Sequence, residues 1–294
     1  MSRKKVLVTG SDGQLGSSLL KLHNEYHSLE LITSDLHNLD ISSAEQVQNF
    51  ITAKQYDFVV NCAAYTGVDK AEQNESTAFS INQLGSKNLA EACEDLKIPL
   101  VHMSTDYVFS GESNIPYIES DLTGPLTAYG RSKLAGEKCV LDSGVYGLII
   151  RTSWLFSEFS SNFVKSMIRL GGQRKDLGVV FDQVGSPTYA GDLARSILEI
   201  LNGYTEGSLV LEKAKVYHYC NHGVCSWYDL AEAVMDFAGL DCKIHPITTE
   251  EFPLPAKRPP YSVLNTRQFR DKFNIDIPHW RSSLAICINN LKSG

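Results

Sequence analysis

The chain has 294 residues, of which 27 are Lys or Arg and 34 are Asp or Glu, so its formal net charge is −7. Apolar residues make up 43% and charged residues 21%, which is ordinary for a globular protein and excludes a largely disordered chain. The acidic balance argues against a protein that binds nucleic acid through its charge. We therefore expect a folded protein whose length suits one large domain or two.

The cysteines and the N-terminal residues indicate the cellular compartment and whether metal ligands are present. Seven scattered cysteines form no Cys-x-x-Cys motif and no group with zinc-ligand spacing, which favours reduced thiols; no metal ligand is predicted, and metal dependence stays open. The first apolar run stops at Thr9 and Gly10, which is too short for a signal peptide. No apolar stretch approaches the roughly 20 residues of a membrane-spanning helix. We predict a cytoplasmic protein with no membrane or nucleic-acid partner.

The first half of the chain alternates short apolar runs with amphipathic helical patterns. The runs predict strands at residues 5–8, 30–34, 58–63, 100–104 and 147–153. Apolar spacing predicts helices over 14–25, 43–53, 80–96 and 128–141, the second of them capped by Ser42 or Ser43. Continuous apolar strands that alternate with helices indicate an α/β fold with a doubly wound parallel sheet of the Rossmann type.

Beyond Trp154 the alternation is less regular. Helices are predicted over 162–170, 191–201 and 227–238, and strands over 178–181 and 216–220. The proline-rich segment 252–260 (FPLPAKRPP) predicts an ordered connection or a substrate loop.

A glycine-rich turn joins the first strand to the first helix. Gly10, Gly13 and Gly16 have the spacing G-x-x-G-x-x-G. A tight turn needs residues without Cβ constraints, and the start of a helix offers unpaired N–H groups and a positive dipole to a phosphate. Glycines between a strand and an amphipathic helix are typical of a dinucleotide-binding loop.

Asp35 ends the second strand, about 20 residues after Gly16, a spacing suited to a carboxylate that binds the adenosine ribose. This favours NADH, because a 2′-phosphate would meet like charge. The nearby His37 could accommodate that phosphate, so the choice between NADH and NADPH stays open. The alternative interpretation is that Asp35 only caps a turn.

Tyr129 and Lys133 stand four residues apart in the helix that follows the fourth strand, so they share one face. An ammonium beside a phenol stabilises the phenolate, and this would make the tyrosine a usable proton donor near neutral pH. Such spacing also occurs by chance. The position of the pair, downstream of a dinucleotide loop, favours a catalytic role.

The strands end in residues suited to a ligand site, and in open α/β sheets ligands bind beyond the carboxyl ends of the strands. After the fourth strand, Ser104 or Thr105 could bond a substrate oxygen, while Asp106 and Tyr107 could hold the substrate. The third strand ends in small residues that would let a cofactor lie close. The fifth strand leads to Trp154.

These residues resemble a known family. The glycine loop, residues 61–65, 104–109 (STDYVF) and 129–137 (YGRSKLAGE) are similar to the extended short-chain dehydrogenases/reductases. Further blocks resemble the dTDP-4-dehydrorhamnose reductases among them, and the match covers nearly the whole chain. These blocks are 68–72 (VDKAE), 151–155 (RTSWL), 162–167 (NFVKSM), 182–188 (DQVGSPT), 225–228 (CSWY) and 258–259.

The resemblance implies NADPH- or NADH-dependent reduction of the C4 ketone of dTDP-4-dehydro-L-rhamnose, in the synthesis of dTDP-L-rhamnose. Tyr129 would protonate the C4 oxygen, Lys133 would lower the tyrosine pKa and bind the nicotinamide ribose, and Thr105 would bond the substrate oxygen. The cofactor would also contact Gly13, Gln14 and Leu15 at the pyrophosphate, Asp40 and Ile41 at the adenine, and Ala63, Ala64 and Tyr65 at the nicotinamide. Asp106, Tyr107 and Trp154 would contact the substrate.

The resemblance also implies a domain division. We expect an NAD(P)-binding Rossmann domain at residues 1–153, rejoined by about 184–220, and a substrate-binding domain at 154–183 and 221–294. An acidic protein that binds a nucleotide diphosphate needs local cations. Arg258, Lys257 and Lys165 are the candidates, with solvated surface charge as the alternative for each.

Two other functions stay open. The chain could reduce another nucleotide-4-ketosugar, or it could be a non-catalytic NADP-binding regulatory subunit of the same fold, although Tyr129, Lys133 and Thr105 argue for catalysis. The residue pattern leaves the oligomeric state open, with a homodimer as one alternative.

Overall fold

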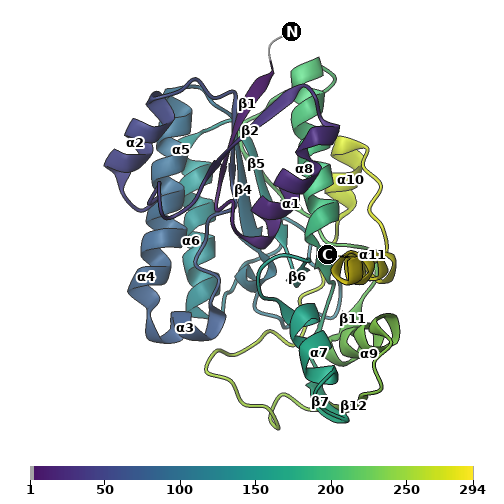
Figure 1. Ribbon diagram of the computed structural model, residues 1–294. Coiled ribbons are helices and arrows are strands. Elements are labelled where there is room, and N and C mark those ends of the chain that lie inside the picture. The colour runs from purple at the N-terminus through teal and green to yellow at the C-terminus, as the bar shows by residue number, and fades with distance from the viewer. Residues whose placement is uncertain (1–2, 294) are drawn as a thin grey trace.

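The computed structural model describes residues 3–293. Its centre is a sheet in the order β10-β5-β4-β3-β1-β2, in which every neighbouring pair is parallel (Figure 1). The predicted doubly wound parallel sheet is confirmed. The strands are β1 (Lys4–Thr9), β2 (Leu29–Ser34), β3 (Phe58–Asn61), β4 (Leu100–Thr105), β5 (Gly147–Thr152) and β10 (Lys215–His218).

Helices cover both faces of this sheet (Figure 1). On one face lie α2 (Ala44–Thr52), α5 (Ser86–Asp95) and α6 (Ala128–Ser143). On the other lie α1 (Gln14–Leu22), α8 (Ala190–Glu206) and α10 (Arg267–Phe273). The strand order reverses between β1 and β3, and such a switch point is where open α/β sheets bind ligands.

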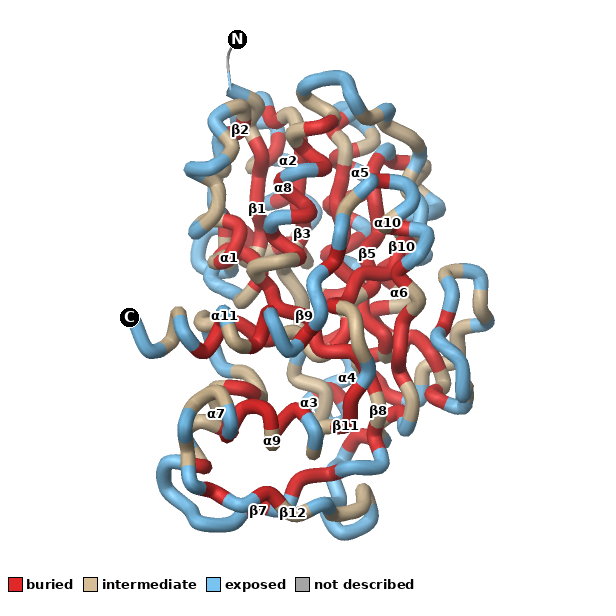
Figure 2. The backbone as a smooth tube through the Cα atoms, turned by 90° about the vertical axis from the view of Figure 1, so that its right-hand side faces the viewer, coloured by how far each residue is buried: buried red, intermediate tan, exposed pale blue. Residues whose placement is uncertain are grey.

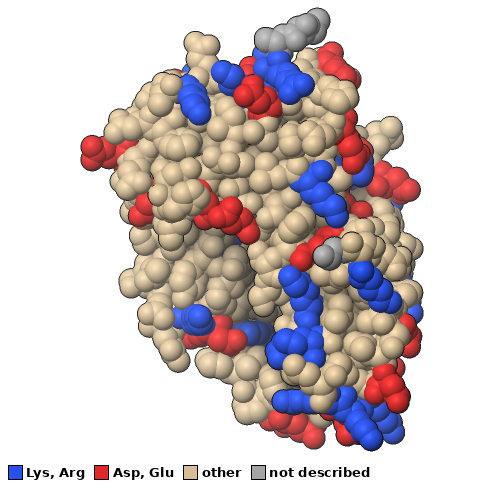
Figure 3. All heavy atoms as spheres, viewed as in Figure 1, with Lys and Arg blue, Asp and Glu red and all other residues tan. Residues whose placement is uncertain are grey.

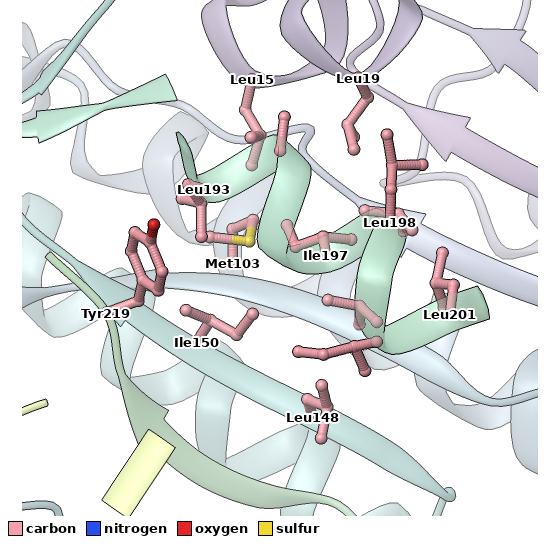
Figure 4. Packing of buried hydrophobic residues seen from close by; sticks show 14 of the residues in the cluster. Leu15, Leu19, Met103, Leu148, Ile150, Leu193, Ile197, Leu198, Leu201 and Tyr219 are labelled. Atoms are coloured by element: carbon pink, nitrogen blue, oxygen red, sulfur yellow. The ribbon is translucent and has the colours of Figure 1, made fainter. Parts of the chain in front are cut away.

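The core explains why α8 returns to the sheet. Leu193 and Ile197 of α8 are fully buried, and Figure 4 shows them between Leu15 of α1 and Ile150 of β5. Phe269 of α10 belongs to the same apolar cluster. The sequence assigned α10 to the smaller domain, but this helix packs on the main sheet because two of its seven residues are buried aromatics.

The helix predicted over 80–96 is longer and interrupted. It consists of α4 (Glu75–Phe79), the π-helical η2 (Ser80–Gly85) and α5. The wide turn brings Asn82 against α6, where a Cβ on Gly136 would lie 2.2 Å from the Asn82 carbonyl oxygen. The sequence analysis missed the short α3 (Val68–Gln73) that precedes α4.

The smaller part lies below the sheet in Figure 1 and has its own apolar core, as the buried segments in Figure 2 show. Its helices are α7 (Phe163–Gly171), α9 (Trp227–Ala238) and α11 (Trp280–Ser293). Paired short strands complete it: β7 (Asp176–Val180) with β12 (Lys243–Ile247), β6 (Leu155–Phe156) with β9 (Thr188–Tyr189), and β8 (Val184–Gly185) with β11 (Cys225–Ser226).

Local signals explain several helix boundaries. Ser43, rather than Ser42, caps α2 by accepting a hydrogen bond from the Gln46 N–H, and Thr127 caps α6 in the same way. Gly144 ends α6 in the left-handed conformation. The remaining short helices are η1 (His23–Glu25) and η3 (Asp106–Val108).

All seven cysteines are free thiols. Within residues 3–293, no helix combines the length and the apolar character that a membrane crossing requires.

Candidate active site

A cleft of about 710 Å³ opens at the carboxyl ends of the parallel strands. Figure 3 shows the molecule hollowed on this face between the sheet-bearing part and the smaller part. Most predicted site residues line the cleft: Gly10, Gly13, Gln14, Leu15, Asp35, Asp40, Ile41, Ala63, Ala64, Thr105, Asp106, Tyr107, Tyr129, Lys133 and Trp154. Three others that the structure describes, Gly16, Tyr65 and Arg258, lie outside its wall.

The glycine loop fits a dinucleotide. Gly10 has φ +63°, and a Cβ there would lie 2.6 Å from the Ala63 nitrogen. A Cβ on Gly16 would lie 2.5 Å from the Gly10 carbonyl oxygen, so Gly16 allows the helix to pack on the turn and need not touch a ligand. No side chain caps the start of α1, and its first turn has no acidic residue. Its N–H groups and dipole are therefore available to a phosphate.

Asp35 and Asp40 line the cleft just beyond the end of β2 and also support its loops. The Asp35 carboxylate accepts hydrogen bonds from the Asp12 N–H (2.9 Å) and the Leu36 N–H (2.7 Å). Asp40 accepts from the backbone and hydroxyl of Ser42. The two interpretations of Asp35 are thus compatible, because a carboxylate has further acceptor positions. His37 is exposed and does not line the cleft.

Tyr129 and Lys133 lie on one face of α6, whose cap at Thr127 places the tyrosine in the first turn. The Lys133 Nζ donates to the Met103 carbonyl oxygen at 2.6 Å. Burial lowers the Lys133 pKa to about 8, and the charge of Glu137 opposes this. Burial raises the Tyr129 pKa to about 12, while the Thr105 hydroxyl lowers it in part. The lowering expected from Lys133 is not seen: besides burial and the Thr105 hydroxyl, the group that acts on the Tyr129 pKa is Asp106, whose charge raises it.

Asp106 and Tyr107 follow Thr105 at the end of β4. Asp106 is buried and accepts a hydrogen bond from the Thr105 hydroxyl at 3.0 Å. Burial raises its pKa to about 6, although the hydroxyls of Ser262 and Thr105 lower it in part. The Tyr107 ring meets the Tyr129 ring edge to face, with centroids 5.6 Å apart. This packing fixes both phenols relative to the cleft.

The smaller part contributes the opposite wall. Trp154 faces the cleft and stacks on Trp227, which lines the cleft too and which the sequence analysis missed. Gln14 ties this wall to the glycine loop, because its side chain donates to the Leu155 carbonyl and accepts from Ser157 and Asn162. Its place in the x position of the glycine motif gives no sign of these contacts.

Tyr65 and the predicted cations lie near the cleft without forming its wall. The Asn82 side chain bonds the Tyr65 backbone, and Tyr65, like Tyr129, packs against a small cluster of buried alanines. Arg258 pairs with Asp69 of α3 at 2.6 Å. Lys165 donates to the Glu158 carbonyl, and Lys257 is exposed. Of the three cations, Arg258 is the one whose charge acts on Tyr107. Burial raises the Tyr107 pKa, and the Arg258 charge opposes this rise.

The arrangement joins a dinucleotide loop to a buried Tyr, Lys and Thr at one cleft, which suits hydride transfer to a carbonyl. A family model, the RmlD substrate binding domain, matches residues 4–293. The chain belongs to this RmlD family. It is 39% identical over 286 residues to a dTDP-4-dehydrorhamnose reductase of Aggregatibacter actinomycetemcomitans, covering 95% of this chain and 97% of that protein.

Of two further relatives, one was solved with a bound cofactor and the other is named for a different ketosugar. The crystal structure of a dTDP-4-dehydrorhamnose reductase from Bacillus anthracis in complex with NADP has a TM-score of 0.91 and 36% identity, with 98% of this chain and 99% of that chain covered. A dTDP-4-keto-6-deoxy-D-glucose reductase of Streptomyces niveus is 38% identical over 281 residues, covering 95% of this chain and 94% of that protein.

Proposed function

We propose that the protein reduces the C4 ketone of dTDP-4-dehydro-L-rhamnose to dTDP-L-rhamnose, with NADPH or NADH as the reductant. The observation that carries the proposal is the grouping of Thr105, Tyr129 and Lys133 in the cleft that the glycine loop also lines. Membership of the RmlD family and the names of its relatives support the choice of substrate.

The roles of the residues follow from their chemistry. When bound, the reduced nicotinamide supplies a hydride to the carbonyl carbon. Tyr129 would donate its proton to the carbonyl oxygen, so that no alkoxide charge accumulates. Thr105 would hold that oxygen by a hydrogen bond, and the Lys133 ammonium would bond the nicotinamide ribose and stabilise the resulting phenolate. Positioning of the two reactants supplies much of the remaining rate enhancement.

The rest of the cleft would bind the two nucleotides. The start of α1, with Gly13, Gln14 and Leu15, would take the cofactor pyrophosphate. Asp35 and Asp40 would accept hydrogen bonds at its adenosine end, and the small Ala63 and Ala64 would leave room for the nicotinamide. Asp106, Tyr107 and Trp154 would contact the dTDP-sugar, and Arg258, which lies beside the cleft without lining it, would do so from there.

The same proposal covers the domain division and the compartment. The larger domain would bind the cofactor and the smaller part would complete the substrate site, as the two walls of the cleft suggest. Seven free thiols and a nucleotide-sugar substrate favour the cytoplasm.

Reduction of a related ketosugar is the second candidate, and the relative from Streptomyces niveus favours it. The test is turnover of purified protein with freshly prepared dTDP-4-dehydro-L-rhamnose and, separately, dTDP-4-keto-6-deoxy-D-glucose, followed by the loss of NADPH or NADH absorbance. We expect the first substrate to be consumed with dTDP-L-rhamnose as product. Preference for the second substrate would establish the alternative, and tight cofactor binding without turnover of either would favour a regulatory subunit.

A further inference from the structure

A buried ion pair lies directly behind the proposed site. Arg151 of β5 donates to Glu137 of α6 through two bonds, Nε to Oε1 at 2.9 Å and Nη2 to Oε2 at 2.7 Å. The two side chains are 5% and 1% exposed. Among the ion pairs of residues 3–293, it is the one in which both partners are buried.

Stability alone does not account for this pair. Removing two charges from water costs so much that a buried pair is often no more stable than apolar residues of the same volume. Both residues belong to blocks that carry the family resemblance, 129–137 and 151–155. The proposed reaction uses neither of them.

His218, on the far side of Arg151, carries no charge. The His218 Nε2 lies 3.4 Å from the Arg151 Nη1, and burial lowers the His218 pKa to about 3. A neutral His218 therefore presents its Nε2 lone pair to the guanidinium, while its Nδ1–H donates to the Tyr117 carbonyl oxygen at 3.1 Å. The Phe109 ring covers the guanidinium, 5.0 Å from its centroid. Glu137 is the carboxylate that bonds Arg151 directly, while the Arg151 charge also acts on the Glu119 carboxyl.

Glu137 stands one helical turn beyond Lys133 on α6, and its charge acts on that lysine without a direct hydrogen bond between them. Tyr129, Lys133 and Glu137 follow one another at intervals of one helical turn on α6, so they share a face. The Ser104 hydroxyl donates to the Glu137 Oε1, and the Lys133 Nζ donates to the carbonyl of Met103. Through these two hydrogen bonds, α6 holds Met103 and Ser104, the two residues of β4 that precede Thr105.

Lys133 is buried, and three titratable groups act on it or are affected by it. Burial raises the pKa of the Cys62 thiol to about 12 and lowers the pKa of His102 well below its usual value, so both are neutral near pH 7. Glu137 supplies the negative charge that opposes the desolvation of the ammonium.

We propose that Glu137, anchored by Arg151, is a positioning residue that keeps Lys133 in its ammonium form and fixes the end of β4 against α6. The inference rests on the proposed function, in which the Lys133 ammonium binds the cofactor ribose and stabilises the phenolate. The proposal gives the buried Glu137–Arg151 pair a role in the reaction, in addition to its role in packing.

The direct test is an NMR titration of Lys133 in protein made with isotope-labelled lysine, assigned with a Lys133→Met variant. In Glu137→Gln, loss of the adjacent negative charge should move the Lys133 titration to lower pH by about one to two pH units. The alkaline limb of the pH profile of kcat/KM should move with it. Glu137→Asp keeps the charge and should recover most of both shifts.

The matched control is Glu75→Gln, which breaks the exposed ion pair of Glu75 with Arg131 on the same helix (2.9 Å). Neither the Lys133 titration nor the pH profile should move in this variant. An unchanged Lys133 titration in Glu137→Gln would overturn the proposal.

A second variant tests whether the pair acts through its charge or only through packing, and it can be used if Glu137→Gln fails to fold. The double variant Glu137→Met, Arg151→Met removes both buried charges at similar volume, which stable proteins tolerate. We expect the double variant to fold and to show the same lowered Lys133 pKa as Glu137→Gln. A Lys133 pKa and a pH profile equal to those of the wild type would mean that the pair is merely structural. Because the titration needs no substrate, the two failures are distinguishable: a shifted Lys133 in a protein without ketosugar turnover would refute the proposed function while retaining the charge coupling between Glu137 and Lys133.

Discussion

The indole rings of Trp154 and Trp227 stack face to face, with centroids 3.6 Å apart and planes 8° from parallel. Trp154 has φ +49°, a left-handed conformation that is costly for a bulky residue and persists only where its surroundings impose it. Gly185 lies beside the same indole, where a Cβ would come within 2.6 Å of its Cε2 atom. Trp227 and the bare backbone of Gly185 therefore hold Trp154 at the cleft.

This relationship predicts the effect of Gly185→Ala. The added methyl group must displace the Trp154 ring, so KM for the ketosugar should rise about tenfold while NADPH affinity stays unchanged. Steady-state kinetics and a cofactor titration measure the two effects. Gly172→Ala is the control, because a Cβ there meets no atom closer than 3.5 Å. A normal KM in Gly185→Ala would remove Trp154 from the substrate site.

Tyr129→Phe removes the proposed proton donor without disturbing the α6 cap. We expect kcat to fall by about 10²–10⁴, the usual size of a general-acid contribution, with cofactor affinity nearly unchanged. Single-turnover absorbance measurements with excess enzyme give the chemical step directly. Turnover at the normal rate would assign proton donation to another group.

Asp35→Asn removes the charge and keeps one of the two loop bonds, since the Asn side-chain oxygen can still accept from the Asp12 N–H while its NH2 group cannot accept from the Leu36 N–H. Removing the negative charge should improve NADPH binding relative to NADH by about fivefold or more, equivalent to about 1 kcal/mol. Fluorescence titrations with each cofactor give the ratio. If the ratio of NADPH to NADH affinity were the same in the variant and the wild type, Asp35 would only support the loop and would not contact the cofactor.

Asp106 should make stability depend on pH. Its pKa in the folded chain, about 6, lies above the ordinary 3.8, so the folded state binds the proton more tightly than the unfolded state. The stability it contributes is fully present below about pH 4 and is lost as the pH rises through about 6. Relative to Asp106→Asn, the wild type should lose up to about 3 kcal/mol between about pH 4 and pH 8.

Urea unfolding of both proteins across this pH range measures the difference, which cancels any pH-independent cost of the substitution. A constant difference between the two unfolding free energies would mean that Asp106 titrates at its ordinary pKa.

The elements that the sequence predicted best are the strands of the main sheet and the helices between them. Their apolar runs are continuous because both faces are covered, as in β1 and β3, where buried residues follow one another. The glycine loop and the Tyr129–Lys133 pair were found because their chemistry depends on local spacing.

The missed features depend on contacts between distant segments. The helix α3 has six residues of which only Ala71 is buried, so it has no apolar periodicity to detect. The π-helical turn of η2 follows from close packing against Gly136. The contacts of Gln14 with Ser157 and Asn162, and of Glu137 with Arg151, join residues whose spacing in sequence carries no signal.

The place of β10 in the sheet has a consequence for biogenesis. The strand pairs with β5, yet the whole of α7 and α8 is synthesised between them. Until residue 218 leaves the ribosome, the nascent chain exposes β5 as an open strand edge, which is a template for pairing with other chains. Truncations that end before β10 should therefore aggregate, and the long-range pairing of β10 with β5 should slow the folding of this half of the molecule.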